Sequence, residues 1–412
     1  MKILHTADWH LGKWLYNLHR LPEQKTVLKE IVEIADTHKV DAILIAGDIY
    51  DQFNPSSETE ELLYQTLKTL TNNGQRPVIA IAGNHDSPLK IAAPDPLARA
   101  CGIIFSSLPN TKIEPFELES GIVITKSDNG FIELKLPDNQ IPLRFILTPY
   151  VNEVRLKRAF TTDNEAVELR ETLQQHWAYL AKKYCNNKGI NILVTHLYVM
   201  EKDGERPEED EDEDSILQRG GAQAIYTENI PSQIQYVALG HLHRYQVITQ
   251  KPCPVVYSGS PLSYSLNEPN QQKNVVILDI QPNKPVKFEN IPLKTPKKLV
   301  AKEFNSVKEA MNWLEKSDNI LVELTIIQDT NLSSKDRKLL LDNYTDKIID
   351  IHGRMTNQPS NELNPRTINR QSKSIEELFY NYFTYKKGQE PNAEIMELFK
   401  EVVAVRKEGD NE

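Results

Sequence analysis

Residues 42–51 read Ala-Ile-Leu-Ile-Ala-Gly-Asp-Ile-Tyr-Asp. An apolar run of this kind, with no polar residue at alternate positions, is typical of a central strand that is buried on both faces. A glycine and then Asp48 follow directly, so a carboxylate stands where this strand is expected to end. In open α/β sheets, ligands bind beyond the carboxyl ends of the strands. The stretch therefore predicts an α/β fold with a functional carboxylate at the edge of a buried sheet.

The same pattern, a strand-like run followed by side chains that can bind metal, recurs at four other places. The motifs are Asp8-Trp9-His10, Gly83-Asn84-His85-Asp86, Thr195-His196 and Gly240-His241-Leu242-His243, after the runs 1–5, 77–82, 191–194 and 235–239. Five of the chain's ten histidines lie in these motifs. One such motif alone is more often structural than functional, but five in the same strand-end context predict one shared site.

The side chains of these motifs suit a pair of divalent metal ions. Two ions about 3.5–4 Å apart can hold both the attacking and the leaving oxygen of a phosphate ester. Asp48 is the expected bridge, because its two oxygens can serve both ions. We expect the first ion to be completed by Asp8, His10 and His243, and the second by Asn84, His196 and His241. Nitrogen and oxygen ligands without thiolates favour Mn²⁺ or Fe²⁺ over structural zinc.

His85 has a different expected role, because it directly follows the candidate ligand Asn84. Its ring can then lie over the bound phosphate, where it would protonate the leaving oxygen or stabilise the transition state. Three other polar residues near the motifs, His5, Asp51 and Asp86, are expected to orient ligands or cap turns rather than to bind metal.

A small α+β module is expected at residues 296–355, after a main domain at 1–285. The elements expected in it are a helix opened by the capping-box pattern at Ser306 and Glu309, a strand at 321–327, a helix at 333–344 and a strand at 347–351. Residues 356–373 are rich in Asn, Pro, Ser and Gln and are predicted to be a linker.

Two amphipathic helices, a helical hairpin, are predicted at residues 374–407. Each carries an apolar stripe with i, i+3, i+4 and i+7 spacing, made of Ile375, Leu378, Phe379 and Tyr382 in the first helix and Ile395, Leu398, Phe399 and Val402 in the second. Two short helices alone cannot bury both stripes. They either fold back onto the chain's own catalytic domain or dock on a partner, and the preceding linker favours docking.

Composition and charge do not decide the substrate. The net charge is −10, but seven acidic residues lie in the single run 208–214, so the rest of the chain is close to neutral. That run is either a solvated loop or a segment that repels DNA until a partner docks. No apolar run approaches the roughly 18 residues of a membrane span. Three widely spaced cysteines and no secretory signal pattern favour the cytoplasm.

Taken in order, the five motifs match the set Asp-x-His, Gly-Asp, Gly-Asn-His-Asp/Glu, His and Gly-His-x-His, and the chain resembles the calcineurin-like metallophosphoesterase superfamily. This resemblance implies an α/β sandwich of two sheets flanked by helices. Residues 5–13, 47–51 and 258–261 are similar to the DNA nuclease subunits of the superfamily, with Ala7 where Ser is usual. The acidic run is not part of that pattern.

The closer resemblance implies Mn²⁺-dependent exonuclease and endonuclease action on double-stranded DNA ends and hairpins, in DNA repair, recombination and replication. It also implies that the module at 296–355 is a capping domain, and that the chain works as a homodimer within a heterotetramer that contains a coiled-coil ATPase. No Gly-x-x-x-x-Gly-Lys-Ser/Thr loop occurs in this sequence. An ATP-driven step would therefore need that partner.

Two other classes of function are possible: a phosphatase of the same superfamily and a non-catalytic assembly protein. A protein phosphatase of the superfamily would carry Gly-Asp-x-x-Asp-Arg-Gly, but Asp51 is followed here by Gln52 and Phe53. A small-molecule phosphatase would have less use for the module and the C-terminal helices. A non-catalytic assembly protein is disfavoured, because every candidate ligand position holds a residue that can bind metal.

Overall fold

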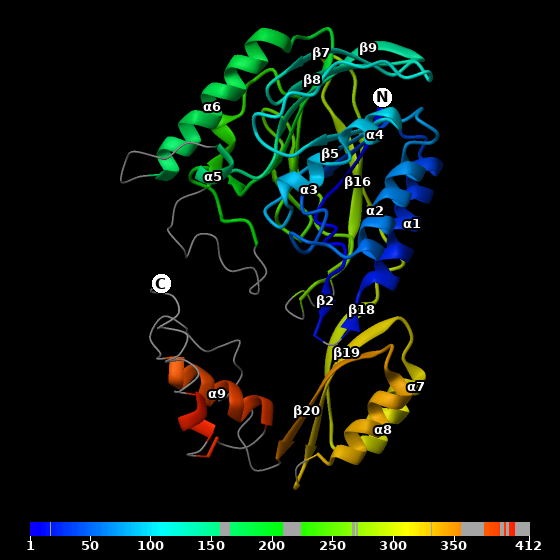
Figure 1. Ribbon diagram of the computed structural model, residues 1–412, viewed down its shortest axis with the longest axis vertical. Helices are drawn as coiled ribbons and strands as arrows, with labels where there is room; N and C mark the ends of the chain where they lie inside the picture. Colours follow the sequence, from blue (N-terminus) through cyan, green and yellow to red (C-terminus); the bar gives the residue numbers. More distant parts are fainter. Residues whose placement is uncertain are drawn as a thin grey trace. The chain divides into compact units, whose positions relative to one another are not determined.

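The computed structural model describes residues 1–412 apart from 17, 157–164, 209–223, 266–267, 269–270, 331, 356–374, 388–390, 393–394 and 400–412. The chain divides into two compact units, Met1–Lys298 and Leu299–Glu412 (Figure 1). The first unit is an α/β sandwich and contains all the candidate metal ligands. The division into four parts that the sequence predicts stays a prediction, because the expected linker lies outside the described residues. Most of the acidic run also lies outside them.

The first sheet has six strands in the order β17-β16-β1-β4-β5-β6. The neighbours among β1, β4, β5 and β6 are parallel, whereas β16 runs antiparallel to both β1 and β17. The strands are Lys2–Thr6 (β1), Ala42–Ala46 (β4), Val78–Ile81 (β5), Ile103–Ser106 (β6), Asn274–Asp279 (β16) and Lys287–Pro292 (β17).

The second sheet has seven strands in the order β14-β15-β13-β10-β9-β8-β7. Its centre, β9, β10, β13 and β15, is parallel, and antiparallel strands flank it on both sides. The strands are Val123–Asp128 (β7), Phe131–Leu136 (β8), Asn139–Thr148 (β9), Ile190–His196 (β10), Tyr236–Gly240 (β13), Gln246–Thr249 (β14) and Val255–Tyr257 (β15).

The two sheets pack face to face, and the strand β4 shows why its sequence is apolar throughout. Ala42, Leu44 and Ala46 point into the core between the sheets, together with residues of β9, β10 and β13. Ile43 and Ile45 point the other way, into the core under the helices α1 and α2. Both faces of β4 are therefore buried, as the unbroken run predicts.

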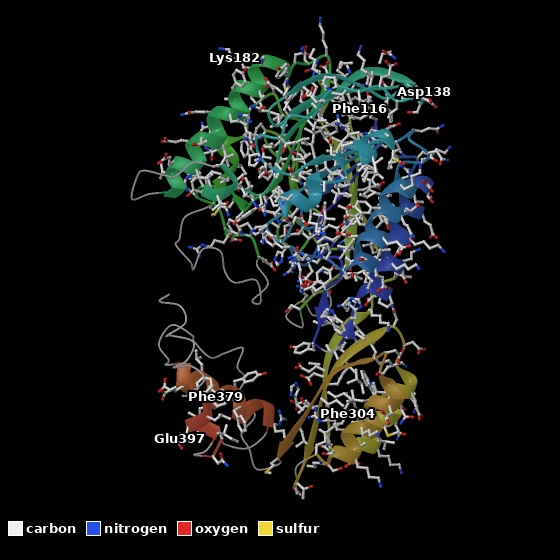
Figure 2. All side chains as sticks on the ribbon, in the orientation of Figure 1. Phe116, Asp138, Lys182, Phe304, Phe379 and Glu397 are labelled. Carbon is white, nitrogen blue, oxygen red and sulfur yellow. The ribbon has the colours of Figure 1, made fainter. Side chains whose placement is uncertain are left out.

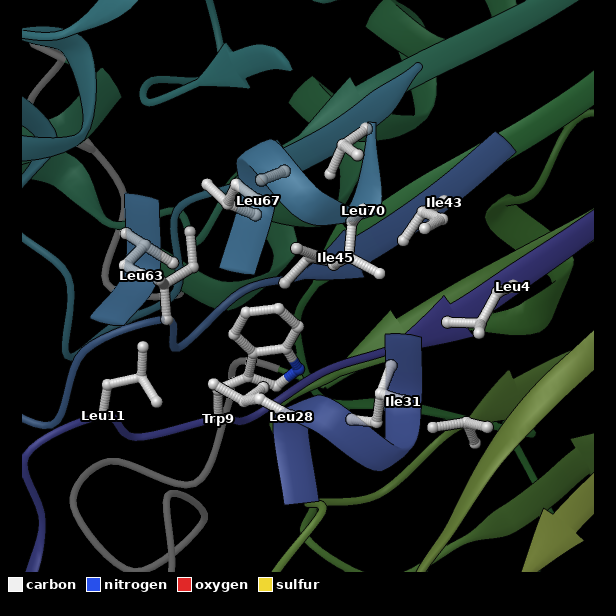
Figure 3. Packing of buried hydrophobic residues seen from close by; sticks show 14 of the residues in the cluster. Leu4, Trp9, Leu11, Leu28, Ile31, Ile43, Ile45, Leu63, Leu67 and Leu70 are labelled. Carbon is white, nitrogen blue, oxygen red and sulfur yellow. The ribbon is translucent and has the colours of Figure 1, made fainter. Parts of the chain in front are cut away.

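Helices cover the outer faces of both sheets (Figure 1). α1 (Leu21–Thr37) and α2 (Ser57–Leu70) pack on the first sheet, where Leu28 of α1, Leu67 of α2 and Ile45 of β4 belong to one buried cluster (Figure 3). α2 begins after Ser56, whose side chain accepts a hydrogen bond from the Thr59 backbone N–H. α6 (Glu165–Tyr184) packs on the second sheet.

The remaining elements of the first unit are short and lie in the connections. They are β2 (Trp14–Leu15), β3 (Leu18–His19), α3 (Pro88–Ala92), α4 (Asp95–Ala100), α5 (Glu153–Leu156), β11 (Val199–Met200), β12 (Ile225–Tyr226) and the 3₁₀ turn Thr227–Asn229. No helix among the described residues is long and apolar enough to cross a membrane.

The second unit contains a three-stranded sheet in the order β18-β19-β20, with two helices packed on it. Its elements are β18 (Lys298–Phe304), α7 (Val307–Lys316), β19 (Ile320–Gln328), α8 (Ser334–Tyr344) and β20 (Ile348–Met355). Ser306 caps α7 by accepting the Glu309 N–H, so the predicted helix start is confirmed. β18 was not predicted, because most of its side chains are exposed and it has no apolar run.

The second unit also contains α9 (Ile375–Lys387) and a helical turn at 395–399. Phe379 of α9, labelled in Figure 2, stacks on Phe399 with ring centroids 3.9 Å apart. Part of each predicted stripe is therefore buried against the other helix. Tyr382 and Leu398 stay 53% and 61% exposed, so apolar surface remains uncovered. Val402 lies outside the described residues.

Candidate metal centre

The candidate ligands converge because five parallel strands end at one edge of two facing sheets. β1, β4 and β5 end side by side in the first sheet, and β10 and β13 do so in the second. β4 lies against β10 and β13 across the core. His196 is the last residue of β10, and the other candidate ligands follow the ends of their strands. The predicted convergence at one point is therefore what the topology produces.

The first group of candidate ligands consists of Asp8, His10 and His243, all buried, whose side chains can offer three donor atoms to one ion. The Nε2 atoms of His10 and His243 are 3.0 Å apart. Oδ1 of Asp8 accepts the backbone N–H of His241 at 2.9 Å. Its other oxygen, Oδ2, is buried with no hydrogen-bond partner among the described residues. An unsatisfied buried carboxylate oxygen is costly unless a cation binds it.

The second group is built around Asn84. Its Oδ1 lies 2.9 Å from Nε2 of His196 and 3.1 Å from Nδ1 of His241. Asp48 lies between the two groups, with Oδ2 3.5 Å from Nε2 of His10 and 3.3 Å from Nε2 of His196. This is the position that a bridging carboxylate needs.

The backbone around the site is strained and closely packed. Four residues of the site have a positive φ, a backbone conformation that residues other than glycine rarely adopt. The values are 55° at Asp8, 43° at His10, 46° at Asp48 and 106° at His241. Such strain gathers at functional sites, where the surrounding structure enforces it. A Cβ at Gly83 would lie 2.1 Å from Oδ1 of Asp48, so only glycine fits there.

Burial and mutual charge set the protonation of the site. Burial lowers the pKa of His10 and of His241 to about 3, so both rings are neutral near pH 7, the form that binds metal. Burial alone would raise the pKa of Asp48, but the nearby imidazoles of His196, His10 and His85 together outweigh burial and hold that pKa well below its ordinary value. Against the lowering effect of burial, Asp48 in turn raises the pKa of His196 to about 9.

These observations fit divalent cations. The donors are imidazole nitrogens, carboxylate oxygens and one amide oxygen, and no cysteine lies among them. This set suits Mn²⁺ and Fe²⁺ and is not that of a structural zinc site.

Asp51 and Asp86 both contact the site. The supporting role expected for Asp51 stays a prediction, because Asp51 also lies with His10 and His85 in a group of side chains that could hold a metal ion. Asp51 Oδ1 lies 3.5 Å from Nδ1 of His10 and accepts a hydrogen bond from Lys13 at 2.8 Å. Asp86 accepts backbone N–H groups of Gly83, Ile49 and Tyr50, which ties the β4 and β5 loops together.

His5 is buried away from the ligands. Its ring nitrogens lie 3.1 Å from the Tyr236 hydroxyl and 3.2 Å from the Leu239 carbonyl oxygen. These contacts join β1 of the first sheet to β13 of the second, so His5 packs between the two sheets. Its expected role of orienting a ligand has no direct contact to support it.

His85 is held by its backbone and by one ring nitrogen. Its N–H donates to Oδ1 of Asp48 at 2.9 Å. Its Nδ1 lies 3.0 Å from the carbonyl oxygen of Asp51, which can only accept, so Nδ1 carries a proton. This contact orients the ring.

Two residues that contact the site could not be found from the sequence. Arg155 donates to the carbonyl oxygens of Gly83, Asn84 and Asp86 at 2.7, 3.3 and 2.8 Å, which braces the loop after β5. No motif surrounds Arg155. The buried Tyr264 ring lies against the His10 and His243 rings, with centroids 5.3 and 5.8 Å away. The Ser-Gly-Ser-Pro motif at 258–261 just before Tyr264 was the one available signal.

Comparison with known proteins agrees with this geometry. Residues 1–245 match the calcineurin-like phosphoesterase family. The SbcD protein of the SbcCD nuclease from Bacillus subtilis is 32% identical over 421 residues, which cover all of both chains. The SbcD proteins from Staphylococcus epidermidis and Staphylococcus saprophyticus are 30% and 31% identical over 73% and 74% of this chain and 71% and 72% of their own. The chain therefore belongs to the calcineurin-like phosphoesterase family and, within it, to the SbcD proteins of SbcCD nucleases.

Proposed function

We propose that this protein is a two-metal phosphodiesterase that cuts double-stranded DNA at ends and hairpins, as both an exonuclease and an endonuclease. The observation that carries the proposal is the position of Asp48. Its Oδ2 lies between the imidazoles of His10 and His196, each of which belongs to a separate group of candidate ligands. Phosphodiester hydrolysis by two metal ions needs such a shared carboxylate.

Under this proposal the residues have distinct roles. One ion would be held by Asp8, His10 and His243, the other by Asn84, His196 and His241, and Asp48 would bind both. When bound, the ions supply positive charge that stabilises the phosphate and activates the attacking water. Mn²⁺ is the ion we favour, because the donor set is mixed nitrogen and oxygen and because the family resemblance implies it.

His85 would act on the substrate itself. With Nδ1 donating to the Asp51 carbonyl, the protonated ring can donate from Nε2 to the oxygen that leaves. The backbone bond from His85 to Asp48 places this proton donor next to the bridging carboxylate. His85 is thus positioned to act as the general acid without being a ligand.

The partners proposed are DNA and an ATPase. The curated relatives are named as the SbcD component of the SbcCD nuclease, so we propose an SbcC-type coiled-coil ATPase as the other component. We further propose a homodimer of this chain within a heterotetramer, acting in DNA repair, recombination and replication. The helices after residue 374 would dock on the ATPase, since Tyr382 and Leu398 leave apolar surface exposed.

A cleavage assay separates this proposal from the alternative, a phosphatase of the same superfamily. The purified chain, alone and with its co-expressed ATPase, would be given linear duplex DNA, a hairpin and a phosphomonoester, each with Mn²⁺ and ATP. We expect both DNA substrates to be cut. Hydrolysis of the phosphomonoester alone would instead identify a phosphatase.

A further inference from the structure

A buried ion pair outside the ligand set lies directly behind the first metal position. Lys273 and Glu268 are 4% and 1% exposed, and Nζ of Lys273 pairs with Oε2 of Glu268. Taking two charges out of water costs more than an apolar pair of similar size would. Such a pair is therefore weak evidence for a purely stabilising role.

Each partner of the pair holds one segment of the first metal position. Lys273 donates to the carbonyl oxygen of His243 at 3.1 Å and to Oγ of Ser260 at 3.1 Å. Ser260 also donates to the His243 carbonyl, from its backbone N–H at 3.0 Å. The carbonyl oxygen of His243 is thus held by two donors, Lys273 and the Ser260 backbone N–H.

Glu268 holds the other segment. Its Oε1 accepts the backbone N–H groups of Tyr264 and Ser265 at 2.8 and 3.1 Å. The Tyr264 hydroxyl donates to the carbonyl oxygen of Trp9, and its ring lies against the rings of His10 and His243. The ion pair therefore bridges the two loops that fix both imidazoles of the first ion.

The pair is also anchored in the sheet that carries Asp8 and His10. Lys273 directly precedes β16, and β16 is hydrogen-bonded along its length to β1. None of the contacts named here reaches Asn84, His196 or His241, the candidate ligands of the second ion. The effect of the pair should thus be confined to one of the two metal positions.

We infer that Lys273 and Glu268 are positioning residues that fix His243 and His10 for the first metal ion and leave the second ion unaffected. This inference rests on the two-metal site proposed above. Groups that orient metal ligands typically contribute about 10–100-fold to metal affinity. Removing the pair should weaken Mn²⁺ binding at the first position by a factor of that order.

The test uses the double variant Lys273→Met/Glu268→Leu, which removes both charges and leaves neither one unpaired. A matched control is Arg144→Met/Glu133→Leu. This second pair is equally buried, with Arg144 Nε 2.7 Å from Glu133 Oε2. It contacts Asn186, which precedes β10, and Asn191 near the start of β10, rather than any ligand. Mn²⁺ binding would be measured by calorimetry and by electron paramagnetic resonance, and folding by circular dichroism.

Two ligand variants, His10→Ala and His196→Ala, show which of the two metal positions is weakened when the ion pair is removed. We expect Lys273→Met/Glu268→Leu to lose one ion in the wild-type background, to change little when added to His10→Ala, and to remove the remaining ion when added to His196→Ala. The control should keep both ions. If the double variant does not fold, Ser260→Ala, which removes one hydrogen bond to Lys273, should show the same selectivity to a smaller degree.

The outcomes distinguish a failure of the two-metal site from a failure of the inference about Lys273 and Glu268. If the wild type does not bind two ions, or if His10→Ala and His196→Ala do not each lose one, the two-metal site itself is wrong. If that site holds, two results overturn the inference: the folded variant binds both ions normally, or it loses both ions equally. For Ser260→Ala too, normal binding of both ions or an equal loss of both would overturn the inference.

Discussion

The backbone N–H of His85 donates to Oδ1 of Asp48 at 2.9 Å, and the opposite oxygen of Asp48 faces His10 and His196. The bridging carboxylate and the proposed acid are thus parts of one hydrogen-bonded unit. His85 reaches this position through its main chain, so its side chain can be changed without removing the bond to Asp48. This separation makes its role testable.

The variant His85→Ala should keep both metal ions and bind DNA, while its cleavage rate falls about 10²–10⁴-fold, the usual loss for a general acid. The reason is that, under the proposal, the ring gives a proton from Nε2 and binds neither ion. Metal content and single-turnover cleavage of duplex DNA measure the two effects. A loss of metal that parallels the loss of activity would show that His85 is a ligand and not an acid.

The convergence of the candidate ligands was predictable, because each lies at or just after the end of a strand whose apolar sequence indicates that the strand is buried. Ala42 to Ala46 is apolar at every position because two cores enclose β4. Parallel strands then bring their carboxyl ends to one edge, so Asp48, His196 and His241 meet although up to 193 positions separate them.

The supporting contacts were not predictable, because they depend on tertiary packing between distant segments. Arg155 donates to the carbonyl oxygen of Gly83, 72 residues away, and no local pattern marks either residue. Lys273 looks like an ordinary surface lysine in sequence, yet it is buried against Glu268. β18 lacks the apolar run that revealed the other strands, since its side chains are mostly exposed.

The buried pair Arg144 and Glu133 should make the first unit sensitive to acid. Burial would raise the pKa of Glu133, but the hydrogen bonds from Arg144, Lys126 and Thr125 together outweigh burial and bring that pKa below its ordinary value of 4.5. A lowered pKa in the folded state stabilises the fold above the ordinary value, and this contribution is lost as pH falls through the lowered pKa. Glu133→Gln should therefore flatten the pH dependence of stability below pH 4.5, as measured by urea unfolding.

A second measurement, at pH 7, tests how much the same pair contributes to the free energy of unfolding. Arg144→Met leaves a buried carboxylate without its partner, which typically costs about 3–5 kcal/mol. Lys90→Met removes the more exposed pair with Glu60 and should cost at most about 1 kcal/mol. Equal losses in the two variants would contradict a special contribution from the buried pair.

Truncation after Lys373 should leave a folded, metal-loaded first unit that no longer co-purifies with the ATPase. Tyr382→Asp/Leu398→Asp should have the same effect in the full chain, because these exposed apolar side chains would place charges in the contact. Phe379→Asp serves as a comparison, since it breaks the stack on Phe399 as well. A sharp drop in the melting temperature of the first unit on truncation would mean that these helices belong to its own core.

The metal content of Asp48→Ala tests the two-metal site most directly. After gel filtration in Mn²⁺, the wild type should retain about two ions per chain, His10→Ala about one, and Asp48→Ala close to none, because Oδ2 of Asp48 faces His10 of one ligand group and His196 of the other. Full occupancy in folded Asp48→Ala would contradict the bridging role of Asp48 and with it the proposed mechanism.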